Sequence, residues 1–566
     1  MESASPGFFA ELTALTAAYA LVDLAVRRDG VVRLLGPLGE TGRTLLLGLL
    51  ALAGGTVFGW DDVVAGDALR AFAAPACLAL AWKAATKDVD PVVGQVHRIA
   101  RGVVVLAALG SVLSPAGMAL CLVVLSSPFG VWQHHATLPM RLLQALTALV
   151  ALLALGPVSA LGESLFATPA AGVLFLMTVP VSHYLITALA KGWLGPRPWS
   201  WVTDNRIHHL AASAYSWGWA RFVPWAVWRR VIGGVRRIEL PMQLAAFGIE
   251  LLAPLALLHP TLAVVFLLGW AAFHLGVFSL SGLLFWEWIV ADLALSATIL
   301  LLPESVRAVA FGPVPMLAGC VFMVAFPLRH RLWKPMPLGW WDTPLTQRMH
   351  WHVVGESGAV YAVTNDFMDP HERIYGKVHG CFLATAPVCT YHLGEVYKHD
   401  LRDAIRGAGP TLEGLEPVRR QFGIQPRSEA MASRHRAYLR AFFGALNGGA
   451  NKSVLPRALR WLKAPGGQIF YWNELPKYRR QEKVVALRIV FREEYFDGET
   501  LVRLRDEVVD ELALPMEAPA EAPAREPTPK ELDDFLLGFA RGKLIDLPSF
   551  GDGYVRTDDG KAAPAE

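Results

Sequence analysis

Several ionisable side chains lie within or beside apolar segments of this chain, where such groups are rare. Lys191 closes the apolar run 169–190. Glu250, His274 and Asp292 lie in three later apolar segments. Ionisable groups at membrane depth are costly and usually face a site or a polar pathway. A desolvated lysine can serve as a general base, because loss of hydration disfavours its ammonium form. These residue types therefore raise the question whether Lys191 is a general base or only a lysine at the end of a span.

The spacing of His183, Thr187 and Lys191 places the three side chains on one helix face, since residues four apart are neighbours on a helix surface. One interpretation is a polar stripe that lines a cavity, with Lys191 as the base. The alternative is a lysine that snorkels to the membrane border and does no chemistry. The first interpretation predicts that Lys191 faces the interior, within reach of His183 or of a polar group from another span.

His274 and Asp292 lie in the middle of their apolar segments. His274 has Trp270 one turn before it, and Asp292 has Ser296 one turn after it, which could satisfy the carboxylate locally. A histidine at this depth either lines a site or makes a structural hydrogen bond between helices. We expect His274, Asp292 and Glu250 to point into the helix bundle, because a polar group that faces hydrocarbon loses its hydrogen bonds to water.

The composition of the chain defines the class of protein. Of its 566 residues, 54% are hydrophobic and 18% are charged, which is too apolar for an ordinary soluble enzyme. The net charge of +3 gives no reason to expect nucleic-acid binding. Apolar residues concentrate before about Pro327, and charged residues follow it. We therefore expect a polytopic α-helical membrane bundle over 1–328, in contact with the lipid bilayer, followed by a soluble α+β domain over 340–514.

A membrane span needs about twenty mostly apolar residues, and several segments approach this length. They are 8–26, 44–60, 71–86, 102–126, 142–161, 169–190, 242–258, 261–284, 286–302 and 309–327. We expect about eight to ten spans. Because Ser114-Pro115 interrupts the run 102–126, this segment is either one kinked helix or a tight hairpin.

The basic residues between the apolar segments predict the orientation of the chain. Lys and Arg favour the cytoplasmic side, and Arg329, Arg331 and Lys334 follow the last candidate span. We expect a multi-pass protein of the cell membrane with a cytoplasmic C-terminal domain. The segment 192–240 is rich in tryptophan and arginine, which indicates amphipathic helices at the membrane surface.

The pattern after residue 340 predicts both strands and helices. We expect strands at 353–363, 382–391 and 484–491, and helices at 401–407, 415–422, 428–446 and 501–512. Gly355-Glu356-Ser357-Gly358 predicts a hairpin turn. The residues 515–529 form a Pro/Ala linker, and a short helix and a disordered tail occupy 530–566.

Cysteines and histidines of the soluble part give only weak signals. Cys381 and Cys389 are either a disulfide or two buried thiols. Asp366 and Asp369 are typical of helix caps, with Pro370 at the first helical position. The other interpretation is a metal or acid–base group made of Asp366, His371, His379, His392, Glu395 and His399. The spacing is irregular, and we predict no metal site.

Three stretches of the membrane part, covering about 170–310, share their order and spacing with a known family. They are Tyr184…Ala188-Leu189-Ala190-Lys191 followed by Trp199, then Glu239-Leu240 to Glu250-Leu251-Leu252-Ala253-Pro254-Leu255, and then Ala271-Ala272-Phe273-His274-Leu275-Gly276 followed by Gly282-Leu283-Leu284-Phe285-Trp286. On these stretches the chain resembles the HTTM (horizontally transferred transmembrane domain) family, which is related to the vitamin K-dependent gamma-carboxylases.

The resemblance implies a chemistry for Lys191. In carboxylases of this kind a lysine deprotonates a reduced quinone, and Lys191 falls at the matching place in the motif. The resemblance thus implies a quinone-like cofactor. The chain departs from the carboxylases in having one lysine where they have two adjacent ones, and it lacks a recognisable propeptide-binding region. These departures leave the reaction less determined than the fold.

Two functions from different classes remain open. The first is a membrane enzyme acting on a lipid-soluble, quinone-like substrate, with Lys191 and His274 as catalytic residues. Its substrate-binding residues would be His183, Tyr184, Trp199, Glu250 and Asp292. The second is a non-catalytic membrane scaffold or a transporter whose C-terminal domain binds a protein partner. An enzyme requires Lys191, Glu250 and His274 to converge on one enclosed site, whereas a scaffold does not.

Overall fold

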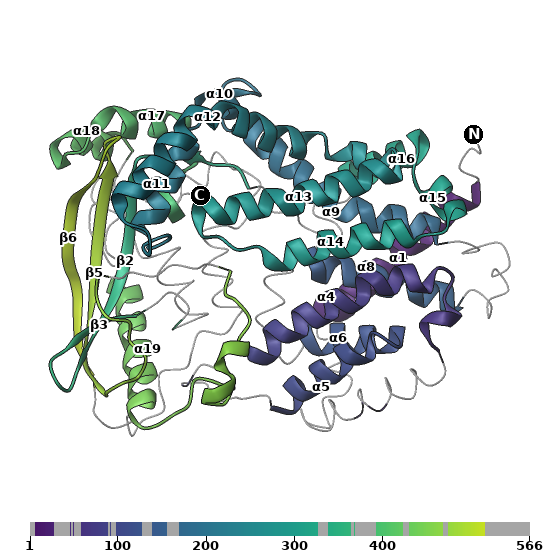
Figure 1. The fold of residues 1–566 in the computed structure, drawn as a ribbon, viewed down its shortest axis with the longest axis horizontal. Helices are drawn as coiled ribbons and strands as arrows, with labels where there is room; N and C mark the ends of the chain where they lie inside the picture. The colour runs from purple at the N-terminus through teal and green to yellow at the C-terminus, as the bar shows by residue number, and fades with distance from the viewer. Residues whose placement is uncertain are drawn as a thin grey trace.

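The computed structural model is mostly helical and carries a β-sheet in its C-terminal part (Figure 1). It describes residues 6–27, 58–88, 98–126, 138–155, 169–325, 338–363, 392–422, 429–467 and 474–514, together with the isolated positions 46, 49, 91 and 367.

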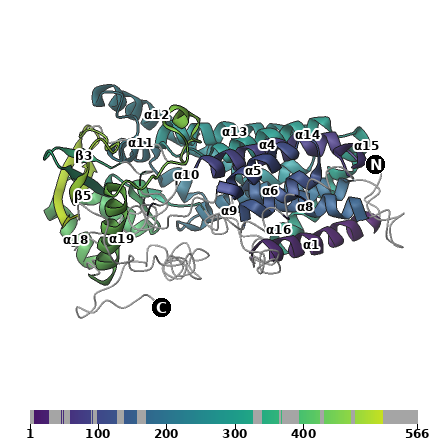
Figure 2. The same cartoon turned by 90° about the horizontal axis from the view of Figure 1, so that it is seen from below.

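The helices of the N-terminal part lie side by side at one end of the molecule, and the sheet lies at the other end (Figure 2). They are α1 (Pro6–Arg27), α4 (Gly66–Thr86), α5 (Arg98–Gly110), α6 (Pro115–Ser126), α8 (Leu138–Leu155), α9 (Ala170–Trp193), α13 (Pro260–Ser281), α14 (Trp286–Leu301), α15 (Glu304–Ala310) and α16 (Pro313–Ala325). Their shared apolar core includes Trp60, Phe72, Phe175 and Trp270, each at most 1% exposed. α9 is buried on nearly all sides, which places its polar residues inside the protein.

Three of the described helices are long and apolar enough to cross a membrane. They are α4, α9 and α13, and the pair α14 and α15, bent by 116°, makes a fourth if it counts as one span. The predicted eight to ten spans are more numerous because several apolar segments form helices of at most 18 residues, namely α5, α6, α8 and α16. At about 1.5 Å of rise per residue, a helix of this length is at or below the thickness of a bilayer core.

Two predicted spans are divided in the structure. The run 102–126 forms two helices, α5 and α6, that pack against each other, so the hairpin is the correct alternative. The segment 242–258 does not form one helix, because α12 ends at Leu251 and a 3-10 helix, η4 (Ala253–Leu257), follows with Pro254 in its first turn. Most of the predicted span 44–60 lies outside the described residues.

The Trp/Arg-rich segment 192–240 forms three helices at the boundary between the bundle and the sheet (Figure 1). They are α10 (Ser200–Asp204), α11 (Ile207–Ser216) and α12 (Trp225–Leu251). α12 buries Trp228, Ile232 and Val235 on one face. Its arginines lie on the exposed part of the helix, as an amphipathic helix requires.

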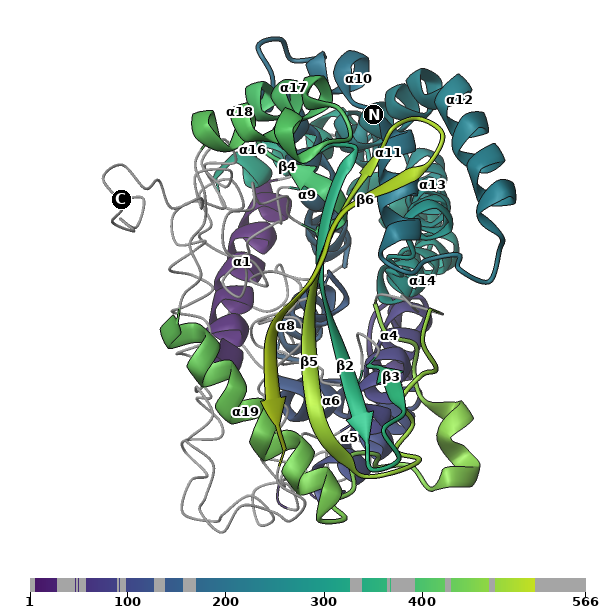
Figure 3. The same cartoon turned by 90° about the vertical axis from the view of Figure 1, so that its left-hand side faces the viewer.

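The C-terminal part is built on a four-stranded antiparallel sheet, in the order β3, β2, β5 and β6 (Figure 3). The strands are β2 (Leu345–Gly355), β3 (Val360–Ala362), β5 (Val484–Phe496) and β6 (Leu501–Ala513). A separate ladder joins β1 (Trp341–Asp342) to β4 (Glu395–Val396). The described residues of this part also form the helices α17 (His399–Ala408), α18 (Leu412–Phe422) and α19 (Glu429–Asn447) and the 3-10 helices η7 (His392–Gly394) and η8 (Arg457–Leu462).

Most predictions for this part are confirmed, and one is wrong. The helices at 401–407, 415–422 and 428–446, the hairpin turn and the strand at 484–491 are present, whereas the strand predicted at 353–363 is divided by that turn. The residues 501–512 form the edge strand β6 and not a helix. Leu, Arg and Glu are good helix formers, but pairing with β5 along the whole strand outweighs this weak preference.

Several predictions concern residues outside the described part of the chain. They are the strand at 382–391, the cysteines Cys381 and Cys389, the linker 515–529, the tail 530–566, and three of the six members of the candidate metal or acid–base group, namely Asp366, His371 and His379.

Candidate functional site

Lys191 lies in the last turn of α9 and is paired with Glu250 of α12. The side chains of the two residues are 8% and 2% exposed. The Nζ atom of Lys191 donates to both carboxylate oxygens of Glu250, at 2.7 and 2.6 Å. The same nitrogen lies 4.5 Å from the ring centre of Trp201, where a cation–π interaction adds to the ion pair. Lys191 is therefore directed into the protein and not toward water.

Tyr184, two turns before Lys191 on α9, joins α13 and α14. Its hydroxyl lies 2.9 Å from Nε2 of His274 and donates to Oδ2 of Asp292 at 3.1 Å. Because a hydroxyl has a single proton, the bond from His274 is donated by Nε2–H, which leaves Nδ1 as a free acceptor. The Tyr184 ring stacks on Trp270, with ring centres 4.0 Å apart.

The turn between α13 and α14 brings His274 and Asp292 together. Gly282 ends α13 with φ of +74°, a conformation that favours glycine. A Cβ atom at this position would lie 2.9 Å from the ring of Trp219, so a side chain does not fit. The chain then reverses and α14 begins at Trp286, with Asp292 facing α9.

Aromatic rings enclose this polar group. The centre of the Trp288 ring lies 5.5 Å from the ring centre of His274 and 6.2 Å from that of Tyr184. Phe285 lies 5.2 Å from His274, and Trp270 covers the face of Tyr184. Flat apolar walls around a few polar atoms are typical of small-molecule sites.

Two buried polar atoms in this group have no hydrogen-bond partner among the described residues. They are Nδ1 of His274 and Oδ1 of Asp292. His274 is 6% exposed and Asp292 is 1% exposed. The side-chain amide of Gln243 on α12 is likewise buried and without a partner there. Since buried polar groups in proteins are nearly always paired, these atoms indicate a place for a ligand or for water.

The Lys191–Glu250 pair and the Tyr184 group share walls. The indole of Trp270 donates to the carbonyl oxygen of Ile249, the residue before Glu250, at 3.2 Å. Phe273, next to His274, has its ring centre 6.0 Å from Nζ of Lys191. Trp270 and Phe273 of α13 thus connect the two polar groups.

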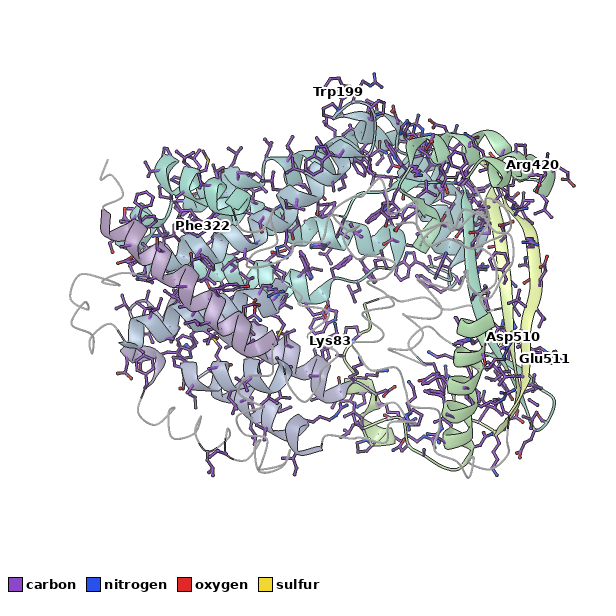
Figure 4. The ribbon with its side chains drawn as sticks, turned by 180° about the vertical axis from the view of Figure 1, so that it is seen from behind. Lys83, Trp199, Phe322, Arg420, Asp510 and Glu511 are labelled. Carbon is purple, nitrogen blue, oxygen red and sulfur yellow. The ribbon has the colours of Figure 1, made fainter. Side chains whose placement is uncertain are left out.

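Of the residues predicted to bind substrate, His183 lies at the edge of this arrangement and Trp199 lies outside it. Nδ1 of His183 is bonded to the carbonyl oxygen of Val179 on its own helix, at 2.8 Å, and not to Lys191. His183 still borders the site through Trp288, with ring centres 5.6 Å apart. Trp199 is 55% exposed at the outer edge of the molecule, so its prediction as a substrate-binding residue is not supported by its position (Figure 4).

The sequence analysis noted Trp270 beside His274, but it did not assign Trp270, Trp288, Trp201 or Gln243 to the site. Trp270 and Trp288 lie one turn before His274 and Asp292, so the helical spacing could have identified them. Trp201 and Gln243 gave no comparable signal, because only the packing of α10 and α12 on α9 brings them inside.

No family model, no curated protein and no solved structure matches this chain. Within the described residues, no group of three or more His, Cys, Asp or Glu side chains is arranged to hold a metal ion.

Proposed function

We propose that this protein is an integral membrane enzyme that binds a lipid-soluble hydroquinone-like substrate and uses Lys191 as a general base. The observation that carries the proposal is the pair of free acceptors, Nδ1 of His274 and Oδ1 of Asp292, inside aromatic walls. Two acceptors match a planar ring that donates hydroxyl protons. The resemblance to the HTTM family points to the same substrate class.

The proposed reaction begins with a proton shift within the buried pair. Lys191 can act as a base only as a neutral amine, and Glu250 is placed to take its proton at 2.6 Å. The amine then accepts a proton from a hydroxyl of the substrate, and the substrate becomes an oxyanion. Tyr184 holds His274 and Asp292 in position through its hydroxyl.

The same proposal places the helical part in a membrane. α4, α9, α13 and the bent α14–α15 pair are long and apolar enough to cross it. The shorter apolar helices α5, α6, α8 and α16 would cross or enter it together with them, which gives a multi-pass bundle with the C-terminal part in the cytoplasm. A reporter fused after Glu566 tests this orientation. Activity of an exported phosphatase at that position contradicts it.

The function is tested by comparing membrane quinone and lipid profiles of cells with and without the protein. We expect a difference that Lys191→Ala abolishes, with a rate loss of about 10²–10⁴-fold. Lys191→Arg does not restore it, because the guanidinium stays protonated. Lys452→Ala is the matched control, since Lys452 is a buried lysine paired with Asp88 elsewhere.

The opposite results favour the other class of protein. Identical profiles with and without the protein, or full function in Lys191→Arg, contradict the enzyme. They leave a membrane scaffold or a transporter in which the Lys191–Glu250 pair holds α9 and α12 together.

A further inference from the structure

Two buried carboxyl groups lie side by side where the helices meet the sheet. Asp342 of β1 and Glu395 of β4 are direct partners in an antiparallel ladder. Directly opposite residues of such a ladder lie about 4.5–5.5 Å apart at Cα, with their side chains on one face. Asp342 and Glu395 are 2% and 3% exposed.

The surroundings of the two carboxyl groups differ. Asp342 accepts hydrogen bonds from the Asn205 amide at 2.6 Å and from the Trp340 indole at 3.2 Å. The carboxyl of Glu395 has no hydrogen-bond partner among the described residues. Asp342 is therefore equipped to carry a negative charge, and Glu395 is not.

Charged and titratable groups face Asp342 from each element packed against it. The Arg406 guanidinium of α17 donates to the Asp342 carbonyl at 2.8 Å, and His209 of α11 lies 3.4 Å from the same oxygen. The charge of Lys191 on α9 also acts on Asp342. Burial raises the pKa of Asp342 to about 6. Burial and the charge of Asp342 raise the pKa of Glu395 well above its usual range.

The strand that carries Asp342 passes directly over the end of α9. A Cβ atom at Gly339 would lie 3.0 Å from the backbone of Lys191, so a side chain there would push the two segments apart by a few tenths of an ångström. Trp201, whose ring covers the Lys191 ammonium, donates its indole N–H to the carbonyl oxygen of Trp340 at 2.9 Å. The backbone just before Asp342 is thus held against the end of α9 that carries Lys191.

We propose that Asp342 and Glu395 hold one proton between them at rest and form the site through which Lys191 returns its proton to water. This inference rests on the proposed function. After each turnover the ammonium of Lys191 passes one proton through water to the Asp342 carboxylate, so that the amine becomes neutral and Asp342 becomes a carboxylic acid. Asp342 then releases the proton to solvent and is ionised again. Glu395 stays protonated throughout, so the pair alternates between one negative charge, when Asp342 is ionised, and no charge, when Asp342 holds the proton.

Infrared titration of the full-length protein in lipid nanodiscs tests the shared proton without any activity. We expect a band of a protonated carboxyl at neutral pH that is lost in Glu395→Gln. Asp342→Asn should lower the pH at which this band titrates, because a neighbouring negative charge is removed. Glu474→Gln is the control, since Glu474 is ionised beside Arg492. An unchanged band in Glu395→Gln overturns the proposal.

The link to Lys191 is tested in the same way. Lys191→Met should raise the titration midpoint of Asp342 by on the order of half a pH unit, whereas Lys452→Met should not. An equal shift, or none, in both variants contradicts the link.

The role of Asp342 and Glu395 in proton release is tested by measuring the steady-state rate. Asp342→Asn with Glu395→Gln should lower the steady-state rate about tenfold or more, while the first proton abstraction keeps its rate. A normal steady-state rate in this double variant contradicts proton release through Asp342 and Glu395, even if the proposed enzyme function is correct. If no turnover is found for the natural protein, the proposed function fails, and the return of a proton from Lys191 fails with it. The infrared results then still decide whether the pair shares a proton.

Discussion

The Lys191–Glu250 pair is the residue-scale feature with the largest energetic consequence. Two charges taken out of water lose their hydration, and their mutual attraction compensates only while both are present. The pair is nearly fully buried, and both carboxylate oxygens are used. Removal of one partner therefore leaves an uncompensated charge inside the protein.

Lys191→Met should lower the free energy of unfolding by about 3–5 kcal/mol, and adding Glu250→Gln should restore most of it. Thermal melting in nanodiscs measures both. Arg229→Met is the control, because the Arg229–Glu499 pair is 47% and 73% exposed and contributes little. Equal melting temperatures for the natural protein and Lys191→Met are incompatible with a buried ion pair.

Tyr184 offers a second test at the same scale. Tyr184→Phe keeps the stacking on Trp270 but removes the hydroxyl that His274 and Asp292 share. We expect a loss of about 1–3 kcal/mol, because two buried polar groups lose a partner. Tyr361→Phe, which breaks a bond to Glu482 near the surface, should change the melting temperature little. A neutral Tyr184→Phe speaks against a hydroxyl that organises the site.

Sequence reasoning found the ionisable residues of this site but not their partners. Lys191, Glu250, His274 and Asp292 stand out because each is polar within an apolar segment. Periodicity shows which residues share a face of one helix. It therefore named His183 as one neighbour of Lys191, but it could not name the polar group of another helix that was the other expected neighbour. Which faces of different helices meet depends on the turns, and the bond between Lys191 and Glu250 joins residues 59 apart in the chain.

At the scale of elements, the close contact of α5 and α6 depends on glycine. A Cβ atom at Gly117 would lie 2.4 Å from the backbone of Gly110, so the two helices cross where neither has a side chain. Ser114-Pro115 predicted a break here, but the sequence left open whether the helices bend or fold back. The contact between the two glycines is the tertiary feature that decides it.

Gly117→Ala should destabilise the hairpin by about 1–3 kcal/mol through overpacking. Gly102→Ala on α5 is a matched control, because a Cβ atom there meets nothing within 4 Å. It should be neutral or slightly stabilising, since alanine favours a helix. Melting temperatures of the two variants give the comparison. A Gly117→Ala protein as stable as the control contradicts the packing of α5 on α6.

β6 shows why a strand was predicted as a helix. Its residues Arg503, Arg505 and Glu507 favour a helix by intrinsic preference, yet they form cross-strand and same-strand ion pairs on the sheet. α19 was predicted correctly because its apolar residues Leu439, Phe442 and Phe443 follow the helical period and cover the sheet core.

At the scale of the whole molecule, the segment 451–467 connects the sheet-containing part to the ends of α4 and α14. The Trp82 indole donates to the Leu462 carbonyl at 2.7 Å, and the Leu284 N–H donates to the Gly467 carbonyl at 2.8 Å. Asp88, just beyond α4, accepts from Lys452 and Lys463 at 2.9 and 3.0 Å. Lys83 and its partner Glu287 join α4 to α14 near the same place (Figure 4).

Asp88 makes this connection sensitive to acid. Burial alone would raise the pKa of Asp88, but the ammonium groups of Lys452 and Lys463 hold it below its usual value of 3.8. A carboxylate with a lowered pKa stabilises the folded state above its unfolded pKa, and this contribution is lost as the pH falls through the folded value. Protection of 451–467 from hydrogen exchange should therefore decrease at pH below about 4.

Asp88→Asn should remove about 1 kcal/mol of this protection at neutral pH and abolish the acid-dependent step, because the amide carries no charge at any pH. Asp67→Asn is the control, since Asp67 is an exposed partner of Arg70 on the first turn of α4. If exchange in 451–467 is unchanged in Asp88→Asn, the two lysines do not hold the segment to α4. The contacts of Trp82 and Leu284 would then be the connection between the helices and the sheet.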